Sequence, residues 1–174
     1  MEQIIYLLEV FTIIDGNSIS ANHIASWDGN SWNTLGSNST NNGVDGTVFA
    51  LAMNGTNQLF VGGHFSIADG NSISVNNVAS WDGNSWNILG TDSTNNGVNG
   101  FVHALAMNGT TQLFVGGYFS IADGGISVNN IASWDGNSWN ILGSNSTNNG
   151  VYAQVYALAM NGTNNLFVGG FYNY

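Results

Sequence analysis

The sequence predicts an all-β protein, a tandem array of about three four-stranded antiparallel sheets. Three observations predict this fold class. A segment rich in Trp, Asn and Gly recurs three times in the chain of 174 residues. Asn-Gly and Asp-Gly pairs, which supply the positive φ angles of tight hairpin turns, divide each copy into four short segments. The 3.6-residue apolar period of an amphipathic helix does not recur.

The repeat has a period of 53–54 residues. Its copies begin at Phe11, Phe65 and Phe119, and the third copy reads ADGGIS where the second reads ADGNSIS. This period is longer than that of the common helical hairpin repeats and fits a unit of four strands. The sequence therefore divides into a degenerate N-terminal strand or cap, residues 1–10, and three repeats, residues 11–174.

Four strands are expected in each repeat. The first strand, residues 48–53, is apolar on both faces, and an Asn-Gly-Thr turn joins it to the second strand, residues 59–63. A loop rich in Asp, Gly, Asn and Ser leads to the third strand, residues 24–27 in the first copy. An Asp-Gly-Asn turn then leads to the fourth strand, residues 31–35. Because strands apolar on both faces need cover on both sides, we expect a buried first strand and a solvent-exposed fourth strand.

The order of these residues resembles the kelch-type β-propeller blade. A strand ends in Gly-Gly, and after a variable loop come an aromatic-Asp pair, a tight turn and a Trp in the fourth strand. The units LFVGG and NIASWDGNSWNILG are similar to a related group of repeats. The resemblance covers the chain after Phe11 three times, although Trp27, Trp81 and Trp134 stand where kelch repeats usually have Tyr. It implies a propeller architecture and no single activity, since the family includes scaffolds, glycan binders and a few oxidases.

The number of strands does not complete a propeller. Rings close with about 4 to 8 blades, and this chain encodes three. The first and the last strand of the chain both correspond to the second strand of a repeat, since Ile4 aligns with Gln58 and the last strand is residues 166–170. If the last two strands joined the third and fourth strands of the first copy, one second strand would be surplus. The surplus strand is expected at the N-terminus, where Leu8-Glu9 replace the Gly-Gly pair.

An open arc of three blades would leave sheet faces and edges uncovered. We therefore expect self-association through blade edges. Two chains can form a six-bladed ring, a half propeller from each, or many chains can form a head-to-tail fibre. A third alternative is that the chain is a piece of a longer polypeptide.

The amino-acid composition limits the classes of molecule that the chain is expected to bind. The chain has ten Asp and Glu, no Lys or Arg and three His, for a formal net charge of −10. This charge argues against nucleic acid and anionic lipid as partners. Without cysteine the chain has no disulfide, thiolate metal site or thiol nucleophile, and no apolar run reaches the length of a membrane span. The expected partner is a second copy or another protein, and a glycan is the alternative.

The copies differ most where a fourth strand passes to the next first strand. Asp45-Gly46-Thr47 becomes Asn99-Gly100-Phe101 and then Tyr152-Ala153-Gln154. The family resemblance implies that this loop shares one end of the propeller with the loop between the second and third strands. Changes on one face of a repeat array often mark a binding face. Relaxed drift in a loop is the alternative. The predicted binding-face residues are Asp45, Thr47, Asn99, Phe101, Tyr152 and Gln154.

Trp residues and Asp-Gly turns suggest two further kinds of site. Paired tryptophans could stack on sugars, but their identical placement in each repeat favours packing between blades. The pairs are Trp27/Trp32, Trp81/Trp86 and Trp134/Trp139. The Asp-Gly turns could bind calcium, yet they lack the alternating spacing of a calcium loop. A structural turn is therefore the expectation, with weak calcium binding as the alternative. These aspartates are Asp15, Asp28, Asp69, Asp82, Asp123 and Asp135.

No pattern indicates catalysis. The three histidines, His23, His64 and His103, occupy three different positions of the repeat, so they predict no repeated metal cluster. The Gly-Gly pairs lie at strand ends without the following helix and Lys of a phosphate loop, so close packing explains them better. Copper-oxidase chemistry of the family uses a cysteine, which this chain lacks. The expectation is a protein that is not an enzyme and has no cofactor.

Five Asn-x-Ser/Thr sequons occur, which matter only where a glycosylation machinery acts. They are Asn38, Asn54, Asn108, Asn145 and Asn161. The N-terminal segment MEQIIYLLEVFTII lacks the positive region of a signal peptide. The compartment stays open, with an extracellular or particle-surface location as the expectation.

Overall fold

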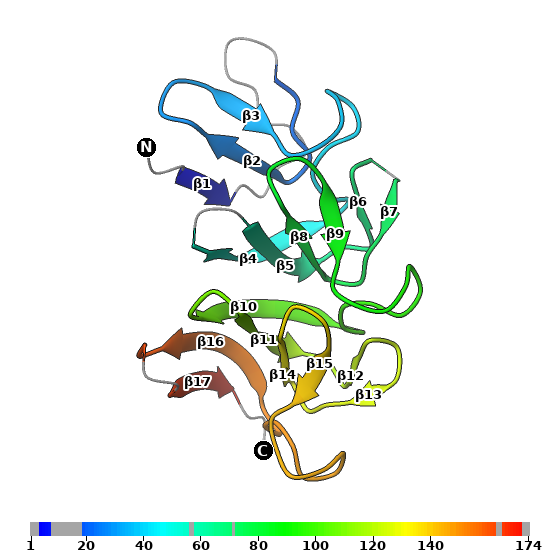
Figure 1. Ribbon diagram of the computed structural model, residues 1–174, viewed down its shortest axis with the longest axis vertical. Coiled ribbons are helices and arrows are strands. Elements are labelled where there is room, and N and C mark those ends of the chain that lie inside the picture. The colour runs from blue at the N-terminus through cyan, green and yellow to red at the C-terminus, as the bar shows by residue number, and fades with distance from the viewer. Residues whose placement is uncertain (1–3, 8–18, 56–57, 71, 163–164, 172–174) are drawn as a thin grey trace.

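The computed structural model describes residues 4–7, 19–55, 58–70, 72–162 and 165–171. Within these residues the fold is all-β, with antiparallel sheets and no helix. No segment of this part of the chain is therefore a helix that could cross a membrane. The sheets follow one another along the long axis of the molecule (Figure 1). The predicted all-β class is thus confirmed.

The first sheet has three strands and the last has two. In the order of the sheet, the first consists of β1 (Ile4–Leu7), β2 (Ile24–Trp27) and β3 (Trp32–Thr34). The last pairs β16 (Gln154–Met160) with β17 (Leu166–Phe171). They lie at opposite ends of the array (Figure 1). Where four strands per copy were expected, only the two middle sheets have them, and no ring closes within the described residues.

The two middle sheets each contain four strands in chain order. Their pairings share one register: Gly62 of the first faces Val78, and Gly116 of the second faces Ile131. The strands of the first are β4 (Thr47–Asn54), β5 (Gln58–His64), β8 (Val78–Trp81) and β9 (Trp86–Ile88). Those of the second are β10 (Phe101–Asn108), β11 (Gln112–Tyr118), β14 (Ile131–Trp134) and β15 (Trp139–Ile141).

Two features differ from the sequence prediction. The loop between second and third strands contains a short hairpin, β6 (Ile67–Ala68) with β7 (Ile73–Ser74). The next sheet repeats it with β12 (Ile121–Ala122) and β13 (Ile126–Ser127). The alignment of Ile4 with Gln58 is wrong by one residue. Ile4 faces Trp27 just as Leu59 faces Trp81, because the connection from β1 to β2 is one residue longer.

The core lies between successive sheets rather than within one of them. One cluster, which includes Ile24, Val48 and Trp86, joins the first sheet to the second. The other, which includes Phe60 and Val102, joins the second sheet to the third. Each sheet thus buries its apolar face against the next one, as stacked sheets do.

Glycine makes this close stacking possible. A Cβ added to Gly62 would lie 2.4 Å from Cγ1 of Val102 in the next sheet, and one added to Gly116 would lie 2.5 Å from Cγ1 of Val155. Both distances are far inside van der Waals contact. The close packing predicted for the Gly-Gly pairs is therefore confirmed at these positions.

Buried asparagines fasten the long loops that join the sheets. The side-chain oxygen of Asn42 accepts a hydrogen bond from the backbone N–H of Asn22 at 2.9 Å, and its amide donates to the carbonyl of Ser20 at 3.1 Å. Asn96 and Asn149 make the same bonds in the next two loops. Buried polar groups satisfied in this way define the loop conformation.

Candidate functional site

The predicted binding-face residues gather at one end of the sheets. Thr47, Phe101 and Gln154 are the first residues of β4, β10 and β16. Tyr152 lies in the loop before β16 and is 75% exposed. These strands are neighbours in the stack, so residues from three copies share one surface (Figure 1).

Asp45 and Asn99 hold this end together. The carboxylate of Asp45 accepts hydrogen bonds from the backbone N–H groups of Ser66 and Ile67 and from the Ser66 hydroxyl. Burial by itself raises the pKa of Asp45, but these hydrogen bonds together lower it. Asn99 accepts from the two equivalent N–H groups, at Ser120 and Ile121. The two kinds of loop therefore meet at one end of the sheets, and these two residues are anchors of that end.

A β-bulge in each first strand turns an aromatic residue out of the regular pattern. The register shifts between Val48 and Ala50, between Val102 and Ala104, and between Val155 and Ala157. Bulges often redirect a side chain. The three residues inside the bulges are Phe49, His103 and Tyr156.

These three side chains form a row across the sheets. The ring centroids of Phe49 and His103 are 5.5 Å apart, edge to face, and those of His103 and Tyr156 are 4.8 Å apart and nearly parallel. Phe101 extends the row, since its ring centroid lies 6.0 Å from that of His103 and 4.4 Å from that of His64. We call Phe49, His64, Phe101, His103 and Tyr156 the aromatic row. Sequence analysis missed it, although an aromatic ring in the same place in three copies was a usable signal.

The aromatic row adjoins a small pocket of about 280 Å³. Phe101 and Tyr118, which face each other across β10 and β11, line it and are 38% and 55% exposed. Asn99, Ser120 and Asn130 supply polar groups to its wall. Exposed rings beside amide and hydroxyl groups suit a ligand with one apolar face and hydroxyl groups at its edge.

The tryptophans of the fourth strands lie between sheets. Nε1 of Trp86 donates a hydrogen bond of 2.8 Å to the carbonyl of Leu35 in the preceding sheet, and Trp139 donates in the same way to Leu89. Both rings are buried, so neither can stack on a sugar. The predicted packing role is confirmed for these two residues.

The tight Asp-Gly turns use their carboxylates within the turn. Asp28 accepts hydrogen bonds from the backbone N–H groups of Ser31 and Asn30 and from the Asn33 amide. These bonds, that of Ser31 first, lower the pKa of Asp28 to about 2. Asp82 and Asp135 make the same bonds in the other copies.

The other Asp-Gly turns join neighbouring sheets. The carboxylate of Asp69 accepts a 2.8 Å hydrogen bond from the backbone N–H of Ser37 in the preceding loop, and Asp123 accepts one from Thr91. Asp15 lies outside the described residues. Among the residues that the structure does describe, no three His, Cys, Asp or Glu side chains form a group that could hold a metal ion.

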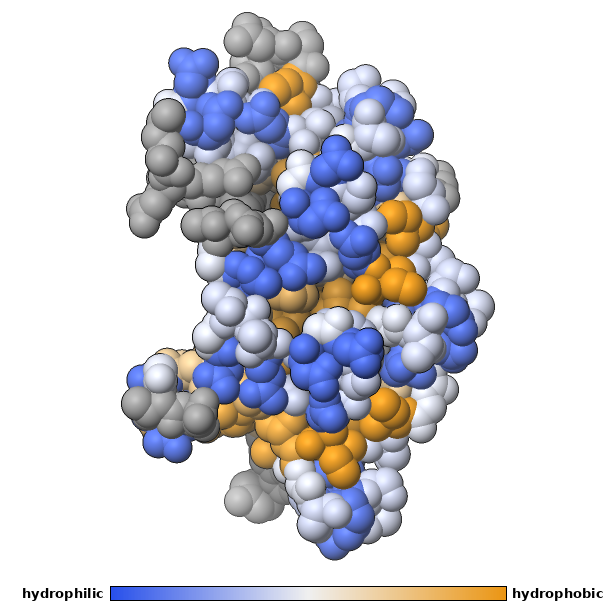
Figure 2. Space-filling model, viewed as in Figure 1, coloured by the Kyte–Doolittle hydropathy of each residue, from blue (hydrophilic) through white to orange (hydrophobic). Residues whose placement is uncertain are grey.

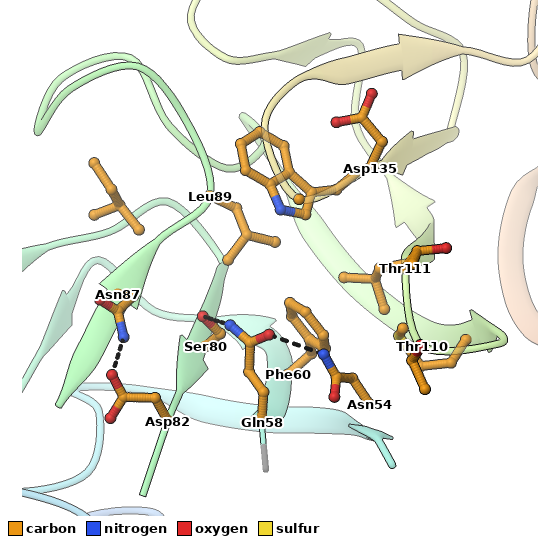
Figure 3. Close-up of a pocket in the computed structure, with 15 residues that line it drawn as sticks. Asn54, Gln58, Phe60, Ser80, Asp82, Asn87, Leu89, Thr110, Thr111 and Asp135 are labelled. Atoms are coloured by element: carbon orange, nitrogen blue, oxygen red, sulfur yellow. Dashed lines mark hydrogen bonds between the residues drawn. The ribbon is translucent and has the colours of Figure 1, made fainter. Parts of the chain in front are cut away.

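The larger cavity, about 540 Å³, lies between the two four-stranded sheets (Figure 3). Its polar side chains bond to one another: Asn54 donates to Gln58, and Gln58 donates to Ser80. Phe60 and Trp134 line it but are almost fully buried. The cavity thus offers a polar wall on which Asn54, Gln58 and Ser80 are already engaged, and its rings Phe60 and Trp134 are too buried for stacking.

The sequons lie in turns and loops at the surface. Asn54, Asn108 and Asn161 lie at or next to the hairpin turns that follow β4, β10 and β16. Asn38 and Asn145 lie in the long loops and are exposed. Asn38, Asn145 and Asn161 are exposed, whereas Asn54 and Asn108 are half-buried and donate their side-chain amides to Gln58 and Gln112.

In the last sheet, β17 exposes apolar side chains on both of its faces, and their counterparts in the earlier copies are buried. Phe167 and Val168 are 58% and 41% exposed. At the same places in the earlier copies, Phe60 is 4% exposed because the next sheet covers it, and Val61, on the other face of the strand, is fully buried against the preceding sheet. In Figure 2, apolar surface gathers over the lower part of the molecule, around β16 and the sheet above it. The last sheet is therefore a second candidate contact surface.

Comparison with known proteins identifies neither of these two surfaces. Neither protein-family models, nor curated proteins, nor solved structures match the chain.

Proposed function

We propose that the chain is a non-enzymatic structural or protein-interaction module of the β-propeller type that associates with further copies of itself. The observation that carries this proposal is the exposure of Phe167 and Val168 on the two faces of β17. Burying a Phe or Val side chain contributes about 1.5–3 kcal/mol relative to leaving it in water. Two such side chains on one uncovered sheet favour association with a complementary surface.

The open arrangement of the strands supports the same proposal. The first sheet lacks a first strand among the described residues, and the last lacks third and fourth strands. Among the described residues, each end therefore has a sheet edge without a paired strand, and such edges are templates for pairing with another chain. A ring of two chains and a head-to-tail fibre both satisfy these edges.

Sedimentation velocity over a wide concentration range tests self-association. We expect the wild-type chain to form dimers or larger species. A variant with Phe167→Ser and Val168→Thr should sediment as a monomer, because it removes the exposed apolar side chains from both faces of β17. The matched control is Tyr118→Ser, which removes a ring of similar exposure from a different sheet and should leave association unchanged. A wild-type chain that stays monomeric at every concentration would refute the proposal.

Glycan binding is the second candidate function, and the pocket beside Phe101 and Tyr118 favours it. Two exposed rings on adjacent strands can stack on a sugar ring. The nearby amides of Asn99 and Asn130 already bond within the chain, so the rings would supply the main contact. A glycan array with the wild type and a Tyr118→Ser variant tests it. Signals lost in the variant but kept in a Tyr152→Ser control would support this candidate. No signal from the wild type would exclude it for the sugars on the array.

A further inference from the structure

Most of β17, whose outer edge is unpaired in the described part of the chain, is identical in sequence to β11, a strand that has a partner on each side within this chain. Leu166-Phe167-Val168-Gly169 repeats Leu113-Phe114-Val115-Gly116 of β11. Within the second four-stranded sheet, β11 pairs on one side with β10 and on the other with β14. β17 has the first of these partners, β16, and has no second partner among the described residues.

The strand that matches this free edge lies at the other end of the chain. Ile24-Ala25-Ser26-Trp27 of β2 is identical to Ile131-Ala132-Ser133-Trp134 of β14. β14 faces β11 with Phe114 opposite Ser133 and Gly116 opposite Ile131. The same two sequences, placed on two different chains, can therefore form the same antiparallel ladder.

β2 at present pairs with β1, whose sequence departs from that of the other second strands. Leu7 faces Ile24, the place that Gly62 and Gly116 hold opposite the third strands of their own sheets. A Cβ at either glycine would come within 2.5 Å of a valine in the next sheet. When the sheets stack closely, the position opposite Ile24 requires glycine. Gly169 of β17 supplies it.

We propose that β17 of one copy pairs with β2 of a second copy, in place of that copy's own β1. The inference rests on the self-association proposed above and specifies its contact. The shared sheet has the order β16, β17, β2, β3, with Phe167 opposite Ser26 and Gly169 opposite Ile24. Two chains that exchange strands reciprocally form a closed pair. Apart from the small β6–β7 and β12–β13 hairpins, the sheets of that pair then have four strands, as the two middle sheets do now.

Disulfide cross-linking tests the register, and the chain suits it because it has no cysteine. Single variants Ser26→Cys and Phe167→Cys are purified separately, mixed, equilibrated and oxidised. Residues directly opposite in a ladder lie close enough for a disulfide. We expect a cross-linked species of twice the 18.4 kDa of one chain, seen on a non-reducing gel. The matched control mixes Ser26→Cys with Val168→Cys, which lies one place away on the opposite face, and should give little of this species.

Two prolines in β1 provide a second measurement. The double variant Ile5→Pro and Tyr6→Pro weakens the pairing of β1 with β2. Successive N–H groups of a strand point to opposite edges, so one of two consecutive prolines must remove a hydrogen bond to β2. If β17 competes with β1 for β2, the double variant in the Ser26→Cys background should cross-link to Phe167→Cys faster than Ser26→Cys alone does.

The outcomes separate this inference from the proposed function. Oligomers of the wild type without the Ser26–Phe167 cross-link, or with equal cross-linking in the Val168 control, would overturn strand exchange and leave self-association intact. A wild-type chain that is monomeric by sedimentation would overturn both.

Discussion

Single side chains define the loops of this protein. Asn38, Asp92 and Asn145 occupy the same place in three successive loops. In each, a side-chain oxygen accepts bonds from the backbone N–H and hydroxyl of the Thr two residues later and from the next N–H. These are Asx turns, in which a short side chain replaces a backbone acceptor. An amide and a carboxylate can both fill this position of the loop, but only the carboxylate changes its charge with pH.

The Asp92→Asn variant tests whether an amide can replace the carboxylate in this loop. Hydrogen bonds, first from the Thr94 hydroxyl and then from the Asn95 backbone N–H, lower the pKa of Asp92 below its usual 3.8. A lowered pKa means that the folded state favours the charged form. Its contribution to stability is therefore present above about pH 4 and is lost as the pH falls through the lowered value.

We expect the melting temperature of the wild type to fall between pH 4 and pH 2, and to fall less in Asp92→Asn. At pH 7 the two proteins should fold alike, since the sister loops already carry Asn. Thermal melts followed by circular dichroism at each pH measure this. An equal acid-induced fall in both proteins would mean that Asp92 contributes nothing to the pH dependence.

At the scale of elements, strand length decided what could be predicted. The expected strands at residues 24–27, 48–53 and 59–63 lie within or match β2, β4 and β5, because apolar runs bounded by Asn-Gly and Asp-Gly turns are strong signals. The β6–β7 and β12–β13 hairpins were missed. Strands of two residues are too short to show alternation, and a tertiary bridge from Val44 to Ala68 helps hold the first of these hairpins.

Alanine at the first glycine of each pair tests how closely the sheets stack. Gly116→Ala would bring a Cβ to 2.5 Å from Val155 Cγ1, and a β-branched valine has little freedom to move away. We expect a loss of about 1–3 kcal/mol in the free energy of unfolding, the usual cost of overpacking. Urea denaturation measures it.

Gly169→Ala is the matched control, because among the described residues its new Cβ would meet only Ala157, with the Cβ at 3.4 Å and the carbonyl oxygen at 3.9 Å. We expect it to leave the unfolding free energy of dilute protein nearly unchanged. Equal losses in the two variants would show that the stacking contact is not the cause. In concentrated protein Gly169→Ala should weaken association, since strand exchange places this residue against a neighbouring sheet.

At the scale of the whole molecule, charge opposes the association that the exposed sheet favours. Each chain carries a formal charge of −10 with no Lys or Arg to compensate it, so two copies repel each other at low ionic strength. Contact between them depends on apolar surface and backbone hydrogen bonds.

Salt should therefore strengthen self-association. Raising the ionic strength from about 0.01 M to about 0.15 M shortens the screening length from about 30 Å to about 8 Å, which reduces the repulsion but not the apolar contact. We expect the apparent dissociation constant from sedimentation equilibrium to decrease across this range. An increase would indicate that attraction between charged groups holds the copies together.

The sequence alone determined the all-β class, the strand order and the turns, because each rests on a local pattern of a few residues. It also predicted that Trp86 and Trp139 pack between sheets, since repeated placement indicates a structural role. The tertiary structure decided what local patterns cannot express. Bulges bring Phe49, His103 and Tyr156 into one row, and Phe167 is exposed while Phe60, the same residue in an earlier copy, is buried. The physical reason is that burial depends on whether a neighbouring sheet covers the residue, and the identical segments LFVGG at residues 59–63 and 166–170 have different neighbours.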